Sequence, residues 1–293
     1  MNNTHQLAEV RLFLGRALSN NAPQDEIPIL QPINDAPVYL LPGHFIGRDQ
    51  EMAQIESFLS PTSSDLVSRC AIYGMSGVGK TQLALKYAAD SFDCGRYSFV
   101  FWISASTNEK ISQSFSKILG LIGHPDRYHP DQMMCMNMAK RWLETYDLPN
   151  RAGWLLVVDN MEESTALLIQ QVLPWRNPRG SILAIARGES IAKVVVNTIN
   201  KGHHLIEVKI PNLDESTDLF LKEAGETAIK PDNTVSKDVQ DLVRRLGCLP
   251  LAVSNIAGFM AKSGKTPSDI LALSRGKERV QVSEPICLAV RMS

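Results

Sequence analysis

The chain has 293 residues, of which 44% are hydrophobic, so it can form one large domain or two modest ones with a sizeable core. Thirty Lys and Arg residues nearly balance 31 Asp and Glu residues, which argues against a dominant nucleic-acid-binding face. The five cysteines have no metal-binding or redox spacing, and no apolar run reaches the roughly 18–20 residues of a membrane span. We therefore expect a cytoplasmic protein with reduced thiols that contacts neither nucleic acid nor a membrane.

The first 44 residues are predicted to precede the main domain. An apolar stripe in residues 1–20 indicates a short amphipathic helix. Residues 21–44 contain five prolines, and proline fixes φ and lacks an N–H group, so this density favours an extended linker. We place a domain boundary near Phe45.

Strand and helix patterns alternate over residues 45–210. Short apolar runs predict strands at 70–73, 98–104, 154–160, 181–186 and 204–208. Helical periodicity predicts helices at 79–91, 107–122 and 131–146. The run at 154–160 is apolar on both faces, as expected of a central parallel strand. Right-handed crossovers then give an α/β fold in which helices cover both faces of a parallel sheet.

The pattern changes after residue 210. Helical segments follow one another with no strand between them, at 214–226, 235–246, 250–262 and 267–274. We predict a small all-helical subdomain over residues 211–275, followed by an unpatterned tail at 276–293.

The strongest functional signal is the sequence GMSGVGKT at residues 74–81. It fits the P-loop pattern G-x-x-x-x-G-K-[ST] and lies between a predicted strand and a predicted helix. Glycines let the backbone approach a phosphate, and the loop N–H groups and the helix N-terminus attract the anion. We expect a purine nucleoside di- or triphosphate with Mg²⁺, with Lys80 on the β- and γ-phosphates and the Thr81 hydroxyl on the metal. The predicted nucleotide contacts of this segment are Gly74, Met75, Ser76, Gly77, Val78, Gly79, Lys80, Thr81 and Gln82.

Two further candidates stand at the ends of predicted strands. Asp159 ends the run at 154–160, where ligands bind in open α/β sheets, and is predicted to hold Mg²⁺ through water. The next residue, Asn160, cannot accept a proton as a general base, which predicts slow hydrolysis unless another residue positions the water. Arg187 follows the strand at 181–186 and would sense the γ-phosphate if that strand lies beside Asp159; the alternative is a surface arginine. Lys80, Asp159 and Arg187 are the candidate catalytic residues.

These motifs together resemble the NB-ARC module of STAND-class P-loop ATPases, especially fungal NLR-like proteins, over about three quarters of the chain. The sequence FIGRDQE at 45–51 is similar to the F-hGRE motif, which implies that the backbone of Phe45, Ile46 and Arg48 cradles the adenine. The sequence GCLPLA at 247–252 is similar to the GLPLA motif, which implies that Pro250 packs on the nucleotide.

Other matches and departures refine the resemblance. WLLVVDN is similar to the fungal form of the family's Walker B strand, and GSILAIAR to the strand whose arginine reads the γ-phosphate. Ala186 replaces the family's Ser or Thr before that arginine, and Cys248 stands at the second GLPLA position. The chain ends about 40 residues after GCLPLA, with no winged-helix or repeat motif, so we interpret it as a fragment, a truncated gene product or a minimal variant.

The resemblance implies an ADP/ATP-dependent signalling switch. ADP is expected to favour a closed state, and ATP an open state that self-associates into a homo-oligomer; no protein partner can be read from the sequence. The adenine preference rests on the resemblance, because the P-loop alone does not separate ATP from GTP. A catalytically active P-loop ATPase or kinase is the alternative, and a remnant that no longer switches is a third interpretation.

Overall fold

The computed structural model describes residues 31–61, 64–147, 152–196, 204–225 and 237–277. The amphipathic helix expected at 1–20 and nearly all of the tail expected at 276–293 lie outside these residues. None of the described helices is long and apolar enough to span a membrane.

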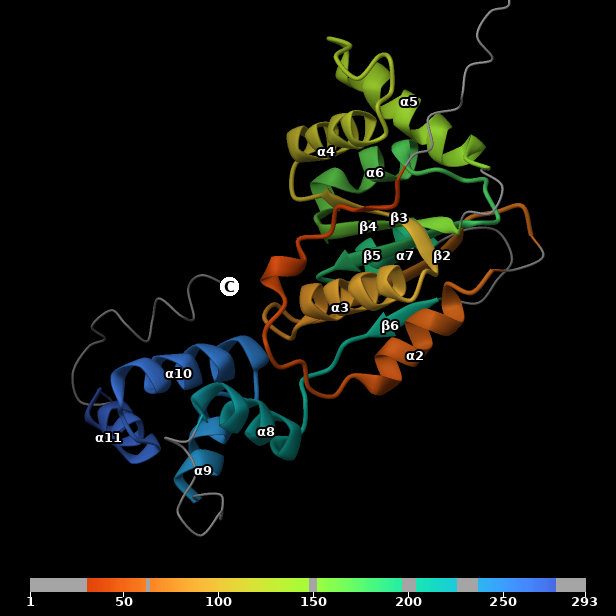
Figure 1. The fold of residues 1–293 in the computed structure, drawn as a ribbon. Helices are drawn as coiled ribbons and strands as arrows, with labels where there is room; N and C mark the ends of the chain where they lie inside the picture. Colours follow the sequence, from red (N-terminus) through yellow and green to blue (C-terminus); the bar gives the residue numbers. More distant parts are fainter. Residues whose placement is uncertain (1–30, 62–63, 148–151, 197–203, 226–236, 278–293) are drawn as a thin grey trace, which may run out of the picture. The chain divides into compact units, whose positions relative to one another are not determined.

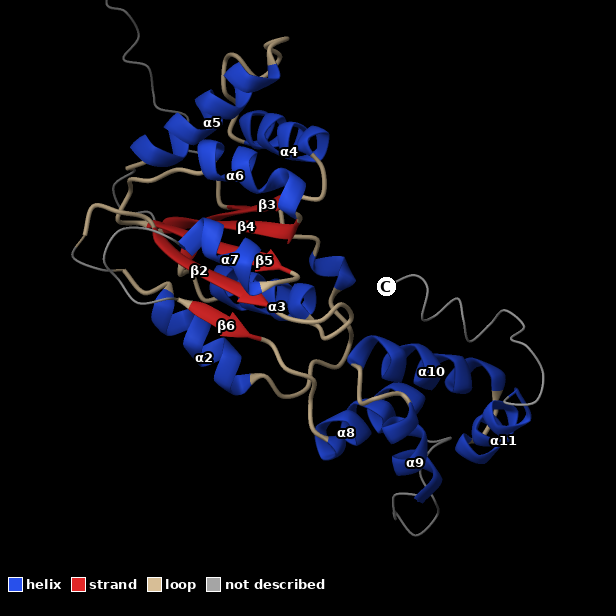
Figure 2. Cartoon of the chain, turned by 180° about the vertical axis from the view of Figure 1, so that it is seen from behind, coloured by secondary structure: helices blue, strands red, loops and turns tan. Residues whose placement is uncertain are grey.

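Six parallel strands form one sheet in the order β1-β3-β4-β5-β2-β6. The part of this order from β3 to β6 can be followed in Figures 1 and 2. The strands are β1 (Ile33–Asn34), β2 (Ser68–Tyr73), β3 (Tyr97–Ser104), β4 (Gly153–Met161), β5 (Gly180–Ala186) and β6 (Leu205–Glu207). All of β5 and most of β4 are buried, as their unbroken apolar runs predict. The prediction of a parallel α/β sheet is confirmed.

Helices cover both faces of this sheet. They are α2 (Asp49–Phe58), α3 (Lys80–Asp93), α4 (Asn108–Leu121), α5 (Gln132–Thr145), α6 (Ala166–Val172) and α7 (Glu189–Val196), with short 3₁₀ turns η1 (Val38–Leu40) and η2 (Glu163–Thr165). Figures 1 and 2, seen from opposite sides, place α3 and α7 on opposite faces. Local signals fix the helix starts, because the side chains of Thr107 and Asp131 accept hydrogen bonds from the first turns of α4 and α5.

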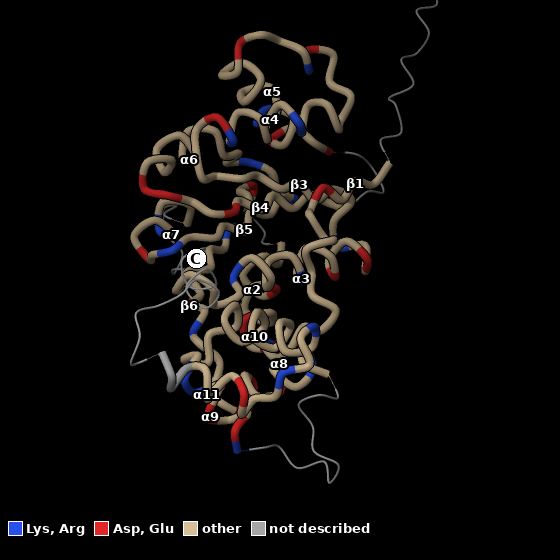
Figure 3. Tube along the Cα trace, turned by 90° about the vertical axis from the view of Figure 1, so that its left-hand side faces the viewer, with Lys and Arg blue, Asp and Glu red and all other residues tan. Residues whose placement is uncertain are grey.

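The C-terminal helices form a separate apolar cluster. They are α8 (Leu213–Ala224), α9 (Lys237–Arg245), α10 (Pro250–Ser263) and α11 (Pro267–Lys277). Asn212 and Glu215 form a capping box at the start of α8, and Pro250 occupies the first turn of α10, where its missing N–H costs nothing. Phe220, Val253 and Met260 are fully buried in this cluster. Figure 3 shows acidic and basic positions interspersed along the described chain.

The structure differs from the sequence-based expectation at the N-terminal side. Ile33 and Asn34, which we assigned to the linker, pair with Phe99 and Val100 as the edge strand β1. An edge strand this short tolerates flanking prolines, because few of its N–H groups need a partner. Helices α2, α6 and α7 were not predicted; α2 buries a single residue, Ile55, so it carries almost no periodic apolar signal. The domain boundaries themselves stay predictions.

Candidate nucleotide-binding site

The loop from Gly74 to Gly79 joins β2 to α3 and requires glycine at both ends. Gly74 has φ 148°, and a β-carbon there would lie 2.5 Å from the carbonyl oxygen of Val208. Gly79 has φ 99° and immediately precedes α3. L-residues with a side chain rarely adopt such φ values, so the glycine pattern reflects the backbone path.

The ammonium group of Lys80 lies inside this loop. It donates hydrogen bonds to the carbonyl oxygens of Gly74 at 2.7 Å and Met75 at 2.8 Å. Burial lowers the pKa of Lys80, the nearby charge of Arg187 lowers it further, and Asp159 opposes the shift. A phosphate would be a stronger acceptor than these carbonyls, because it is charged.

Thr81 and Asp159 come together across the sheet edge. The Thr81 hydroxyl donates to Oδ1 of Asp159 at 3.2 Å. Burial raises the pKa of Asp159, while hydrogen bonds from Thr81 and the Asn160 backbone and the charge of Lys80 lower it. The described residues contain no cluster of three or more His, Cys, Asp or Glu that could hold a metal alone. A hydroxyl and one carboxylate nevertheless fit Mg²⁺, which usually keeps several waters and takes phosphate oxygens as further ligands.

Arg187 lies at the same edge because of the strand order. The strand β5, which ends at Ala186, pairs with β2 on one side and β4 on the other. This confirms that the strand at 181–186 lies beside the strand of Asp159. The Arg187 side chain is 59% exposed, and its Nη2 atom lies 3.6 Å from Oε1 of Glu162. Its predicted role on the γ-phosphate stays a prediction.

Two adjoining pockets collect most of the predicted residues. The larger pocket has a volume of about 460 Å³, and the smaller pocket about 100 Å³. The predicted residues that line the larger pocket are Ser76, Gly77, Gly79, Lys80, Thr81, Gln82, Asp159, Arg187 and Pro250. Those that line the smaller pocket are Phe45, Ile46, Arg48, Val78, Gly79, Gln82 and Pro250. Gly74 and Met75 line neither pocket; their carbonyls hold Lys80 instead.

The NB-ARC domain family model matches residues 48–230, which is more than half of the chain. The chain belongs to the NB-ARC family. It is 29% identical over 243 residues to a nucleotide-binding leucine-rich repeat (NLR)-like protein of Hyaloscypha variabilis, covering 78% of this chain and 23% of that protein. It is 25% identical over 224 residues to the putative disease resistance RPP13-like protein 2 of Arabidopsis thaliana, covering 75% of this chain and 25% of that protein. This NB-ARC chain therefore spans about a quarter of the length of these two relatives.

A solved structure supports the fold of this NB-ARC chain. Cdc6p from Pyrobaculum aerophilum superposes with a TM-score of 0.55 at 15% sequence identity, covering 79% of this chain and 67% of that one. At this identity the likeness concerns the fold alone.

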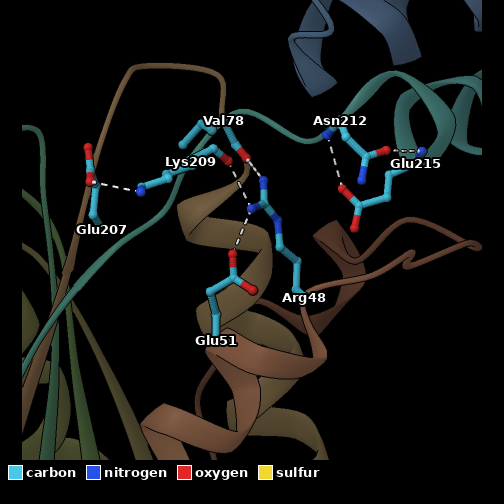
Figure 4. Close-up of polar contacts among 7 residues, drawn as sticks. All are labelled: Arg48, Glu51, Val78, Glu207, Lys209, Asn212 and Glu215. Carbon is cyan, nitrogen blue, oxygen red and sulfur yellow. Dashed lines mark hydrogen bonds and ion pairs between the residues drawn. The ribbon is translucent and has the colours of Figure 1, made fainter.

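The guanidinium of Arg48 joins three segments of the NB-ARC chain, as Figure 4 shows. It donates to Oε1 of Glu51 at 2.8 Å, to the carbonyl oxygen of Lys209 at 2.9 Å and to that of Val78 at 3.0 Å. Its side chain is 13% exposed. The sequence predicted Arg48 as a nucleotide contact. In the structure its guanidinium binds the P-loop backbone and the backbone of the segment that leads into α8.

The helical part of the NB-ARC chain touches the P-loop directly. The backbone N–H of Leu251 donates to the carbonyl oxygen of Gly77 at 3.2 Å. The side chains of Leu249 and Leu251 crowd the same glycine, since a β-carbon on Gly77 would lie 3.2–3.3 Å from them. The N-terminus of α10 is therefore packed against the phosphate-binding loop.

Sequence reasoning missed several pocket residues of the NB-ARC chain. They include Leu40, Pro42, Glu223, Leu251 and Ser254. Leu40 and Pro42 were hidden in the proline-rich stretch that we assigned to a linker. Ser254 carried a usable signal, because it stands one helical turn after Pro250 and so shares its face of α10.

Proposed function

We propose that this NB-ARC chain is an ADP/ATP-dependent signalling switch that hydrolyses ATP slowly at most. The observation that carries the proposal is the contact of α10 with the P-loop, where Leu251 donates to Gly77 and Pro250 lines both pockets. A nucleotide in these pockets would touch the sheet and the helical part at once. Its phosphates would therefore bias how α10 packs on the loop.

A switch requires that the two nucleotides bind the two states with different affinities, because equal affinity shifts no equilibrium. The γ-phosphate is the only chemical difference between ATP and ADP. The pocket carries two cationic side chains suited to that added charge, Lys80 and Arg187. Thr81 and Asp159 would hold Mg²⁺, which neutralises phosphate charge when bound.

Slow hydrolysis follows from the residues beside Asp159. Asn160 lines the larger pocket with φ 57°, a left-handed conformation that asparagine tolerates, and its amide cannot accept a proton from water. Among the described residues lining this pocket, the carboxylates are Asp159 and Glu223. Asp159 is the predicted metal ligand, so Glu223 of α8 is the remaining candidate base.

The alternative function is an active ATPase or kinase. The observation in its favour is the carboxylate of Glu223 in the larger pocket, which could act as the base. Steady-state turnover decides between the two, because kinases commonly reach about 1–100 per second. We expect turnover far below 1 per second. Sustained turnover in the kinase range, abolished by Glu223→Gln, would reject the switch in favour of catalysis.

The switch itself is tested by comparing ADP with a non-hydrolysable ATP analogue, both with Mg²⁺. Hydrogen exchange should differ between the two complexes at residues 249–254, where α10 meets the P-loop. Light scattering should report a larger assembly with the ATP analogue than with ADP. Identical exchange and identical mass in the two complexes would contradict the proposal.

A further inference from the structure

Gln82 stands at the boundary between the two pockets. It is the third residue of α3, directly after Thr81. The residues that line both pockets are Pro42, Gly79, Gln82, Pro250 and Ser254. The larger pocket contains the phosphate-binding residues, and the smaller pocket contains the apolar side chains of Phe45 and Ile46. A nucleotide with phosphates in one pocket and base in the other has its sugar at this shared boundary.

The side chain of Gln82 also has an unused acceptor. Its Oε1 atom is buried and has no hydrogen-bond partner among the described residues. Buried polar atoms without partners are uncommon in folded proteins, and each one calls for a physical reason, such as a ligand that binds there. Two other described atoms share this condition, on Asp35 and Ser106, and neither residue lines the two pockets.

We propose that the amide oxygen of Gln82 accepts a hydrogen bond from a ribose hydroxyl of the bound nucleotide. The proposal rests on the proposed nucleotide binding, because it needs a nucleotide in the site. Ionised phosphates offer no donor to an amide oxygen, whereas each sugar hydroxyl offers one. The adenine amino group is a donor too, but the base belongs in the smaller pocket beyond the boundary. Gln82 thus makes the site discriminate against a nucleotide whose sugar lacks the hydroxyl that it contacts.

The test compares ADP with 2′-deoxy-ADP and 3′-deoxy-ADP, all with Mg²⁺, by isothermal titration calorimetry. The wild-type chain should bind ADP about 3–10-fold more tightly than one of the two deoxy analogues, the range expected for one neutral hydrogen bond. Gln82→Met keeps an unbranched side chain of similar length but removes the amide. It should lose ADP affinity by a similar factor and bind ADP and that analogue equally.

Two further variants serve as a conservative replacement of Gln82 and as a matched control. Gln82→Glu retains an acceptor oxygen, so it should preserve the preference for the ribose hydroxyl even though its charge weakens binding of every nucleotide. Gln113→Met is the matched control, since Gln113 is exposed on α4 and away from the pockets. This control should bind all three nucleotides like the wild type.

The outcomes separate this inference from the function on which it rests. If the wild type binds ADP and both deoxy analogues equally, the ribose contact is wrong and the nucleotide site stands. The same conclusion follows if Gln82→Met keeps the wild-type preference for ADP. Inosine diphosphate, which lacks the adenine amino group, is titrated as well. If the wild type prefers ADP to inosine diphosphate and Gln82→Met does not, the amide reads the base and the ribose contact is overturned. If the wild type binds none of these nucleotides, the proposed function itself fails.

Discussion

The hydroxyl of Thr81 lies 3.2 Å from Oδ1 of Asp159, although the two residues are 78 positions apart in the chain. The contact exists because β2, which leads into the P-loop, and β4, which carries Asp159, end at the same edge of one parallel sheet with β5 between them. It gives the pocket two oxygen atoms suited to Mg²⁺ beside the lysine suited to phosphate.

Thr81→Val should remove most of the gain in ATP affinity that Mg²⁺ provides. Valine keeps the branched shape but has no oxygen, so we expect apparent Mg²⁺ affinity to fall by at least about tenfold. Titration of a fluorescent ATP analogue with Mg²⁺ or with EDTA measures this. Thr145→Val is the control, because the Thr145 hydroxyl donates to carbonyls of its own helix. A Thr81→Val chain with full Mg²⁺ dependence would exclude Thr81 as a metal ligand.

The affinity for ADP should fall at alkaline pH, because Lys80 loses its proton there. The phosphates need the charged ammonium, so affinity is full below the pKa of Lys80 in the free protein and falls as pH rises through it. Burial lowers this pKa from the ordinary 10.5, so the fall should begin at a lower pH than an exposed lysine would give. Lys80→Arg stays charged and should show a flatter alkaline limb, even if it binds more weakly. Calorimetric titrations from about pH 7.5 to pH 10.5 would refute this if wild-type affinity stays level throughout.

Arg48 is predicted to act by positioning the P-loop. Arg48→Ala should lower the free energy of unfolding by about 2 kcal/mol, because it removes the charged donor of three hydrogen bonds. It should weaken ADP binding as well, since Val78 belongs to the loop. Arg48→Lys should recover only part of both losses, because an ammonium cannot reproduce the planar fork of donors.

The control for Arg48 is Arg244→Ala, whose side chain is 53% exposed and pairs with Asp241. Its loss should change stability by less than about 1 kcal/mol. Urea unfolding and ADP titration are measured on all three variants. If Arg48→Ala keeps wild-type stability and loses only ADP affinity, Arg48 contacts the nucleotide directly and the positioning role is wrong.

Gly74 should not tolerate a side chain. Gly74→Ala would place its β-carbon 2.5 Å from the carbonyl oxygen of Val208. Val208 is held in place, because its N–H donates a hydrogen bond to the carbonyl oxygen of Tyr73 at 2.8 Å. We expect a loss of about 1–3 kcal/mol in unfolding free energy together with loss of ADP binding. Gly120→Ala is the opposite case, because its site on α4 is open, and it should stabilise the chain by about 0.5–1 kcal/mol. A Gly74→Ala chain as stable as wild type, with normal ADP affinity, would show that the loop path is wrong.

The sequence was informative where the chemistry demands particular residues in order. The P-loop, Asp159 and the buried strands could be predicted because glycines, a lysine and unbroken apolar runs in this arrangement are typical of few other structures. The strand order that brings Arg187 to the site was an assumption, since neighbours in a sheet are not written in a single sequence. The structure confirms that order.

Other parts carried no local signal. The strand β1 and the pocket residues Leu40 and Pro42 lie among prolines, and their environment comes from tertiary contacts alone. The hydrogen-bond partners of Arg48 could not be predicted either, because a sequence motif gives the position of a residue but not its partners. Gln82 was expected to contact nucleotide, yet only the structure shows its oxygen buried without a partner among the described residues.

Binding of an adenine nucleotide at the P-loop is best tested by nucleotide retention combined with thermal stability. The purified chain is denatured, the released nucleotide is identified by chromatography, and melting is followed with added Mg²⁺ and ADP for the wild type, Lys80→Ala and Lys86→Ala. At about 100 times its dissociation constant, ADP should add roughly 2.7 kcal/mol, or about 5–10 °C, to the wild type and to Lys86→Ala, whose exposed lysine pairs with Asp90. Lys80→Ala should release no nucleotide and show no shift. A wild-type chain that releases no nucleotide and does not respond to ADP, or a Lys80→Ala chain that responds fully, would rule out nucleotide binding through Lys80.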